Sequence, residues 1–303
     1  MRKLISIISV AIVIVLPVQA QKREDPPWLK SFVNKRIVYQ VPGMNNVRVK
    51  KNLIYKRAGD RNLEMDVYTP RTGARLPAVL FVHGGRVPAN LLTTPKDWAV
   101  YVSFGELMAA SGFVGVTFNH RFYAWESLAD SQADVMDAIK YVRDNAATLN
   151  VDPERIVLWT VSAGGIFLSQ LLQERPTYLN SIVAYYSQLD LQNERKSAPA
   201  SVSDETLRQF SPVYHLEKSA PTESNKAASL FPPMFIARAG LDDPGLNDGL
   251  DRFVQAALRN NVAVELFNHP TGHHGFDIED DNARSREILK RTVEFLKTHA
   301  WRK

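Results

Sequence analysis

The feature that most constrains the fold is a set of short, uninterrupted apolar runs separated by stretches of helical pattern. The clearest runs are 78–82, 114–118 and 156–160, and such runs are typical of strands that are covered on both faces of a parallel sheet. Residues 131–146 carry apolar side chains three and four positions apart, which predicts an amphipathic helix. Strands that alternate with helices in this way predict an α/β fold, with a mostly parallel central sheet and helices on both faces.

Further elements extend this pattern along the chain. Residues 63–68 alternate with period two, as expected of a half-buried edge strand. The remaining expected elements are, in chain order, a helix at 165–174, strands at 181–186, 233–237 and 262–267, and a closing helix at 282–299. Residues 193–230 are rich in Ser, Ala, Glu and Lys and break the rhythm. We expect them to form a lid-like insertion over the functional site.

Residues 1–20 have the pattern of a secretory signal peptide. Arg2 and Lys3 make a basic start, an apolar run follows, and Val18-Gln19-Ala20 offers small residues for cleavage. The apolar run is too short to span a bilayer comfortably, although an uncleaved N-terminal anchor is the alternative. We therefore expect one domain over 21–303, secreted or periplasmic in a bacterium, with no stable membrane insertion after cleavage.

The composition excludes several classes of site. The 303 residues include no cysteine, which rules out a thiolate metal site, a cysteine nucleophile, disulfides and a lipoprotein anchor. Lys and Arg number 37 against 32 Asp and Glu, and the basic residues are scattered among acidic ones. Nucleic-acid binding is therefore not expected.

The sharpest motif is the segment from Thr160 to Gly165, which reads Thr-Val-Ser-Ala-Gly-Gly between a predicted strand and a predicted helix. A serine in such a tight turn has its hydroxyl held above the sheet, where a base can reach it, and the following helix N-terminus favours negative charge. Ser162 is therefore a candidate nucleophile; an ordinary turn serine is the alternative. Thr160 stands where the usual pattern has glycine.

A second motif, His83-Gly84-Gly85, directly follows the strand that ends at Val82. Two glycines let backbone N–H groups approach a substrate oxygen closely, as an oxyanion hole requires, and the N–H of Ala163 could join them. The alternative is a strand-end turn that needs positive φ. His83 is expected to brace this loop rather than to transfer protons.

Histidines and aspartates follow the last two predicted strands. A catalytic imidazole has to lie on a loop above the sheet, and the His-Gly-Phe triplet favours His274 over His273. A metal pair is less expected, because adjacent histidines point in divergent directions and no acidic cluster accompanies them. Asp242 is favoured as the carboxylate that orients the imidazole, while Asp243 is the alternative, since one of the two could cap the next helix.

The order of these motifs along the chain is that of the α/β-hydrolases, Ser then Asp then His. Each motif lies at the end of a predicted strand, and the active sites of open parallel sheets lie at the carboxyl ends of the strands. Motifs that are weak individually therefore agree in both order and placement.

With these motifs the sequence resembles a known family, the esterase/lipase branch of the α/β-hydrolases. This branch includes carboxylesterases, acetyl-hydrolases and feruloyl-esterase-like enzymes with a His-Gly-Gly oxyanion loop. The likeness runs from Leu63 to the C-terminus, and includes residues 145–147 and 151–156, a stretch that such enzymes often carry before the serine turn. The resemblance assigns the catalytic triad to Ser162, Asp242 and His274, and the oxyanion hole to Gly84, Gly85 and Ala163.

The resemblance implies a serine hydrolase that cleaves small-molecule esters and needs no metal or organic cofactor. Thr160 and the segment Arg86-Val87-Pro88 depart from the family pattern, in the serine turn and after His-Gly-Gly respectively. Two rival interpretations are a peptidase of the prolyl-oligopeptidase kind, which usually carries a large N-terminal propeller, and a catalytically silent binding protein that keeps the fold.

Overall fold

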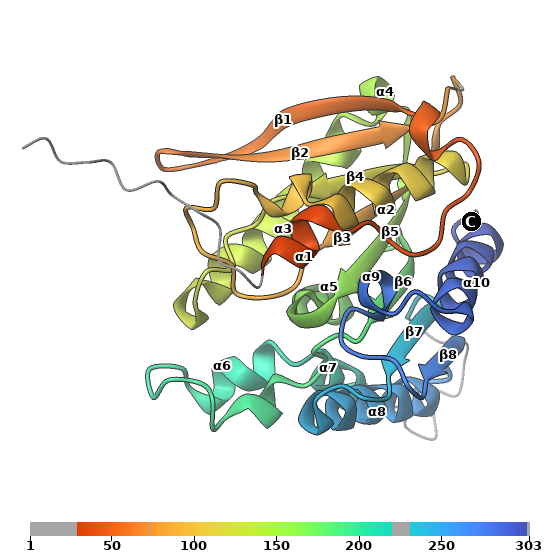
Figure 1. Cartoon of the computed structure of the whole chain (residues 1–303). Helices are drawn as coiled ribbons and strands as arrows, with labels where there is room; N and C mark the ends of the chain where they lie inside the picture. Colours follow the sequence, from red (N-terminus) through yellow and green to blue (C-terminus); the bar gives the residue numbers. More distant parts are fainter. Residues whose placement is uncertain (1–28, 72, 220–230, 302–303) are drawn as a thin grey trace, which may run out of the picture.

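The computed structural model describes residues 29–71, 73–219 and 231–301, which are arranged around an eight-stranded sheet (Figure 1). The strand order is β1-β2-β4-β3-β5-β6-β7-β8; the pairs β1–β2 and β2–β4 are antiparallel and every other pair is parallel. The strands are β1 (Arg48–Ala58), β2 (Arg61–Thr69), β3 (Leu76–Val82), β4 (Val114–Phe118), β5 (Val151–Val161), β6 (Leu179–Tyr185), β7 (Met234–Ala239) and β8 (Val264–His269). The predicted fold class is thereby confirmed.

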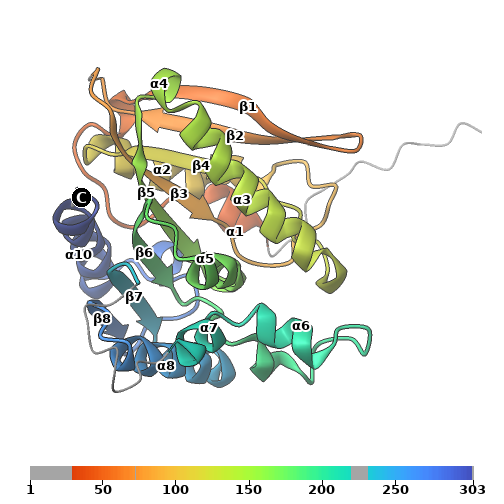
Figure 2. The ribbon, with the colours of Figure 1, turned by 180° about the vertical axis from the view of Figure 1, so that it is seen from behind.

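The described helices cover both faces of this sheet. They are α1 (Leu29–Asn34), α2 (Ala99–Ala110), α3 (Leu128–Asp144), α4 (Ala146–Leu149), α5 (Leu168–Glu174), α6 (Asp204–Gln209), α7 (Pro212–Lys218), α8 (Pro244–Arg259), α9 (Phe276–Glu279) and α10 (Ala283–His299). In Figure 1, α1, α2 and α10 lie on the near side of the sheet, and Figure 2 shows α3 and α5 on the other side. None of the described helices is long and apolar enough to cross a membrane.

The apolar runs are continuous because each strand serves two cores. In β3, Val79 and Phe81 pack into the core beneath α2 and α10, whereas Ala78, Leu80 and Val82 pack into the core beneath α3, α5 and α8. Alternate side chains of a strand point to opposite faces, so a strand with helices on both sides needs apolar residues at every position.

The antiparallel end of the sheet differs from the prediction. Residues 63–68 were expected to form an edge strand, but β2 pairs on one side with β1 and on the other with β4. The edge strand is β1, which the sequence did not reveal because most of its side chains are exposed and it carries Lys50, Lys51, Lys56 and Arg57. Charged residues on an edge strand discourage pairing with other chains, and they remove the alternating pattern that predicts a strand.

Helix α2 was also missed by the sequence analysis. Eight of its twelve residues are buried, so it lacks the polar stripe by which an amphipathic helix is recognised. Two predicted helices differ in their bounds: α3 begins at Leu128, and α5 begins at Leu168 after a 3₁₀ helix, η4 (Ser162–Phe167). The other predicted strands overlap the observed ones.

The predicted insertion at 193–230 contains two short helices in its described part. Helix α7 packs against α5 and α8, while α6 packs against α7. Residues 220–230, like the predicted signal peptide at 1–20, lie outside the described residues. The lid role of the insertion therefore stays a prediction.

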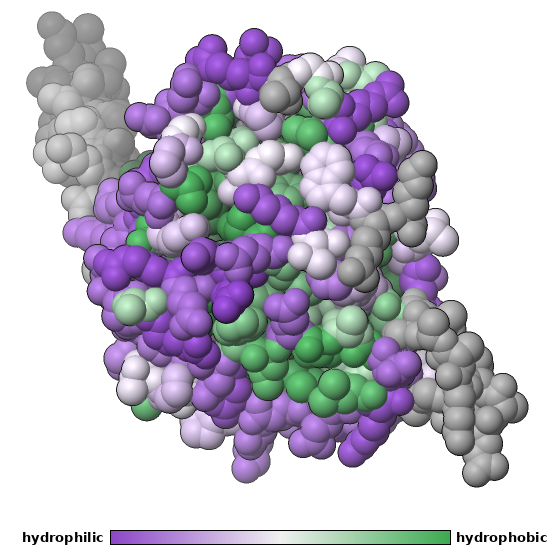
Figure 3. All heavy atoms as spheres, turned by 90° about the vertical axis from the view of Figure 1, so that its right-hand side faces the viewer, coloured by the Kyte–Doolittle hydropathy of each residue, from purple (hydrophilic) through white to green (hydrophobic). Residues whose placement is uncertain are grey.

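The opposite edge of the sheet is β8, where Leu266 is 45% exposed and Glu265 is also exposed. Figure 3 views the molecule from the right-hand side of Figure 1, where α10 and β8 lie. Hydrophilic residues cover most of this side and surround a smaller hydrophobic area.

Candidate active site

The turn after β5 places Ser162 in a strained position. Ser162 has φ +52°, a left-handed conformation that is unfavourable for a residue with a side chain and that marks functional turns. The chain passes through this turn in very little space: a Cβ at Gly164 would lie 2.5 Å from the Val82 carbonyl oxygen, and one at Gly165 would lie 2.7 Å from that of Gln188. Only glycine fits at these two positions, which explains the pair of glycines after Ser162.

Thr160 occupies the position where glycine was expected, and its side chain has a defined place. It is fully buried, and its Oγ1 lies 3.0 Å from Ser187 Oγ. Ser187 Oγ in turn donates to the Thr160 carbonyl at 3.1 Å. The threonine side chain therefore joins β5 to the segment after β6. The Ser162 turn forms although position 160 is not glycine.

Three side chains from distant parts of the chain meet above the carboxyl ends of the strands. His274 Nε2 lies 2.9 Å from Ser162 Oγ, and His274 Nδ1 lies 2.7 Å from Asp242 Oδ2. The side chain of Asp242 is only 6% exposed, whereas that of His274 is 38% exposed. With its proton on Nδ1, the imidazole donates to Asp242 and accepts from the serine hydroxyl, as a general base for that hydroxyl must.

The alternatives to Asp242 and His274 have other partners. Asp243 Oδ1 caps α8 by accepting from the N–H groups of Gly245 and Leu246 at 2.8 and 3.2 Å. His273 Nδ1 lies 3.0 Å from Asp280 Oδ1. The structure thus brings Asp242 and His274 to Ser162, and it gives Asp243 and His273 hydrogen bonds elsewhere.

The His-Gly-Gly loop lies directly against the serine. A Cβ at Gly84 would be 2.6 Å from Ser162 Cβ, and Gly85 has φ +71°, so both positions require glycine. The N–H of Gly84 donates to the Tyr101 hydroxyl at 3.3 Å, and it would have to leave this partner to reach an oxyanion. The oxyanion role of Gly84, Gly85 and Ala163 stays a prediction, with Gly85 and Ala163 as its first candidates.

His83 is packed inside this loop. Burial lowers the pKa of His83 to about 4, and its ring stacks on that of His120 at 3.6 Å. His83 Nδ1 lies 3.0 Å from the Gly84 carbonyl oxygen, and His120 Nε2 lies 3.2 Å from the His83 carbonyl oxygen. A neutral, enclosed imidazole with these contacts suits the bracing role predicted from the sequence.

Comparison with known proteins places this geometry in a family. The family model described as BD-FAE matches residues 65–238, more than half of the chain. The chain belongs to the BD-FAE family. The resemblance to the esterase/lipase branch of the α/β-hydrolases is thereby confirmed.

Relatives of this BD-FAE protein include named esterases. The "Probable isoprenylcysteine alpha-carbonyl methylesterase ICMEL1" of Oryza sativa subsp. japonica is 25% identical over 245 residues, 73% of this chain and 55% of that protein. "Carboxylesterase NlhH" of Mycobacterium tuberculosis is 27% identical over 227 residues, 69% of each chain. The BD-FAE protein thus spans only about half the length of the rice relative.

Solved structures show the same fold. The apo form of esterase 2 from Thermogutta terrifontis superimposes with a TM-score of 0.66 at 24% sequence identity, covering 85% of this chain and 96% of that one. The butyrate-bound form of the same enzyme gives a TM-score of 0.65.

Two cavities of the BD-FAE protein meet at Ser162 and Gly85. One has a volume of about 190 Å³ and is mainly apolar; its lining includes Val87, Trp98, Val100, Tyr101, Phe104 and Tyr186. The other has a volume of about 240 Å³ and includes Arg86, Trp125, Gln188, Leu191 and Glu194. Arg86 lies over the Trp125 ring at 4.9 Å, so the segment that departs from the family pattern shapes the second cavity.

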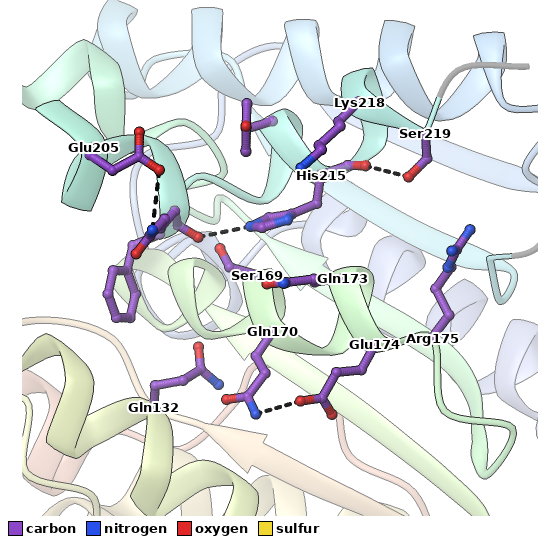
Figure 4. A pocket seen from close by; sticks show the side chains of 13 residues that line it. Gln132, Ser169, Gln170, Gln173, Glu174, Arg175, Glu205, His215, Lys218 and Ser219 are labelled. Carbon is purple, nitrogen blue, oxygen red and sulfur yellow. Dashed lines mark hydrogen bonds between the residues drawn. The ribbon is translucent and has the colours of Figure 1, made fainter.

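A larger cavity of about 810 Å³ lies apart from this site, between α3, α5, α6 and α7 (Figure 4). Its lining is mostly polar: Gln132 comes from α3, Gln170 from α5, Glu205 from α6 and Lys218 from α7. Neither Ser162 nor another member of the predicted triad lines it.

The sequence analysis assigned no role to a buried pair beside His274. Tyr186 Oη donates to Asp277 Oδ1 at 2.5 Å, and the Asp277 side chain is fully buried. Burial raises the pKa of Asp277 to about 6, although its hydrogen bond from Tyr186 and the nearby His274 act in the other direction. The position of Asp277 three residues after His274 was the only signal available, and it suggests no function by itself.

The raised pKa of Asp277 predicts how the stability of the protein depends on pH. Its pKa is raised from 3.8 in the unfolded chain to about 6 in the folded protein, so the unfolded chain releases the proton first as the pH rises. The contribution of Asp277 to the free energy of unfolding should therefore be largest below pH ~4 and fall by about 3 kcal/mol in total as the pH rises through ~6. We therefore expect the free energy of unfolding in urea of the wild type, minus that of Asp277→Asn, to decrease by that amount across this pH range. A difference that is constant or that grows with pH contradicts this account.

Proposed function

We propose that this protein hydrolyses carboxylic esters through an acyl-enzyme intermediate on Ser162. The observation that carries the proposal is the continuous hydrogen-bonded chain from Ser162 Oγ through His274 to Asp242, with separations of 2.9 and 2.7 Å. Family membership and the esterase relatives support the same reaction class.

In the first step, Ser162 Oγ gives its proton to His274 Nε2 and forms a bond to the carbonyl carbon of the ester. The carbonyl oxygen takes up negative charge, which the N–H groups of Gly85 and Ala163 would stabilise. When the tetrahedral intermediate collapses, the bond between the carbonyl carbon and the alcohol oxygen breaks, and His274 returns the proton to the alcohol.

In the second step, a water molecule replaces the alcohol. His274 Nε2 takes a proton from this water, the hydroxide attacks the acyl carbon, and the bond to Ser162 Oγ breaks with return of the proton to serine. Asp242 keeps the imidazole in the required tautomer and stabilises the imidazolium in both steps. The proposed cycle uses no metal or organic cofactor.

The two cavities at Ser162 suggest how an ester is divided. The apolar cavity of about 190 Å³ would hold the acyl group, because its lining consists mainly of aromatic and aliphatic side chains. The cavity of about 240 Å³ contains Arg86, Gln188 and Glu194 and would hold a more polar alcohol. We therefore propose that the substrates combine an apolar acyl group with a polar alcohol.

The nucleophile is tested by Ser162→Ala. We expect hydrolysis of short p-nitrophenyl esters to fall by about 10⁴-fold or more, because the group that forms the covalent intermediate is lost. The control is Ser169→Ala. Ser169 is a buried serine on α5, close in sequence to the turn, and this variant should keep wild-type activity. A Ser162→Ala protein that folds, by circular dichroism, and retains full activity would exclude the mechanism.

The acyl cavity is tested by Val100→Phe, which fills space in its lining. For p-nitrophenyl esters of longer acyl chains, kcat/KM should drop by about tenfold or more, with little change for the acetate, since each excluded methylene is worth roughly 1–3 kcal/mol. Leu191→Phe in the other cavity is the control and should leave the preference for acyl length unchanged. Equal losses for all chain lengths in Val100→Phe would place the acyl group elsewhere.

We also propose that the protein is exported, on the pattern of residues 1–20. Expression of the full chain in a bacterium should yield a periplasmic or secreted protein whose first residue, by N-terminal sequencing, is Gln21. A protein that stays in the cytoplasm and begins at Met1 contradicts this.

A further inference from the structure

We propose that Tyr186 and Asp277 form a positioning pair that holds the His274 imidazole and stabilises its protonated form during catalysis. This inference rests on the proposed esterase function. It gives His274 a second source of negative charge besides Asp242, which lies at Nδ1.

The backbone at Tyr186 is strained, and the strain places its ring. Tyr186 directly follows β6 and has φ +36°, which is a true outlier for a bulky side chain. Its N–H donates to the Ala237 carbonyl at 2.7 Å, so pairing with the end of β7 holds this conformation. Strained residues persist where the surroundings over-determine them, and they cluster at functional sites.

The strained residue lies against the imidazole. The ring centroids of Tyr186 and His274 are 4.7 Å apart, with an interplanar angle of 58°. The Tyr186 ring also makes an edge contact with Phe276 at 5.5 Å, which restricts its movement. A cation within about 6 Å of an aromatic centroid is attracted by the ring, so this contact favours the imidazolium that forms when Ser162 loses its proton.

Asp277 fixes the tyrosine and adds charge behind it. Asp277 Oδ1 accepts the Tyr186 hydroxyl at 2.5 Å, and Oδ2 is buried without a hydrogen-bond partner among the described residues. The Asp277 carbonyl accepts from the Val38 N–H at 2.8 Å, so the segment after α1 also holds this turn. A carboxylate that accepts a hydrogen bond from the phenol increases the negative charge available to the ring and to His274.

Several charged and titratable groups surround Asp277, and only some of them favour its charged form. From β6 and the residue after it come Tyr185 and Tyr186, and from α2 comes Tyr101. On its own segment, His274 favours the carboxylate and Glu279 opposes it. His274 is therefore the one group in this set that becomes cationic in the proposed reaction, and it benefits from the Asp277 charge.

Two variants test the pair with little change of shape. Tyr186→Phe keeps the ring but removes the hydroxyl, and Asp277→Asn keeps the shape but removes the charge. In each, kcat should fall by about tenfold, as expected for loss of a hydrogen bond to a charged group, while KM changes less than twofold. The acid limb of kcat/KM against pH should also change position in both variants, an effect that loss of packing alone would not produce.

Tyr185→Phe is the matched control. Tyr185 is the adjacent, equally buried tyrosine, and its hydroxyl bonds to Thr292 Oγ1 at 2.6 Å. This variant should lose stability to thermal unfolding but retain kcat and the wild-type pH profile.

The proposal is overturned if Tyr186→Phe and Asp277→Asn keep wild-type kcat and the wild-type acid limb, or if Tyr185→Phe reproduces their losses. These results differ from failure of the esterase function, which would appear as an inactive wild type or as an active Ser162→Ala. Should Asp277→Asn not fold, Tyr186→Phe decides the question alone.

Discussion

The candidate active site depends on the parallel register of the central strands, because this register brings the ends of separate strands to one edge of the sheet. Val82 of β3 pairs with Thr160 of β5, and Val161 pairs with Tyr185 of β6. Tyr185 in turn pairs with Ala237 of β7, and Ala239 pairs with His269 of β8. The loops that leave these ends carry Gly84 and Gly85, the serine, Tyr186, the aspartate and the histidine.

The turns at this edge of the sheet are held by close packing, since the chain has no cysteine and therefore no disulfide. Glycine is required at 84, 164 and 165 because neighbouring backbone or side-chain atoms lie within 2.5–2.7 Å of where a Cβ would be. Burial at this edge also sets the charges: His83 stays neutral, while Asp277 is held closer to neutrality than an exposed carboxyl. The site thus combines a tightly packed turn with an imidazole that is open enough to meet a substrate.

The sequence predicted the parts of this arrangement that leave a local signal. The apolar runs of β3, β4 and β5 identify strands buried on both faces, and the residues after β3, β5, β7 and β8 include the groups that the structure brings together. The sequence favoured Asp242 but left Asp243 as an alternative, because both lie shortly after β7 and only the structure shows that Asp243 caps α8.

Other parts leave no such signal. Strand β1 is hard to recognise because most of its side chains are exposed and several are basic, and α2 because it is buried on most sides. The cavity that we propose for the acyl group takes Val100 and Tyr101 from α2 and Trp98 from the position before it, where they resemble ordinary core residues. Tyr186 is positioned by a backbone conformation with positive φ, which the sequence around it does not predict.

The account is tested most directly by peptide mass spectrometry after reaction with a fluorophosphonate, which labels serines that are activated as nucleophiles. It predicts one adduct per chain, on the peptide that contains residue 162, formed far more slowly when the histidine at 274 is replaced by alanine. A wild-type protein that stays unlabelled, or that carries the adduct on a different serine, would contradict it.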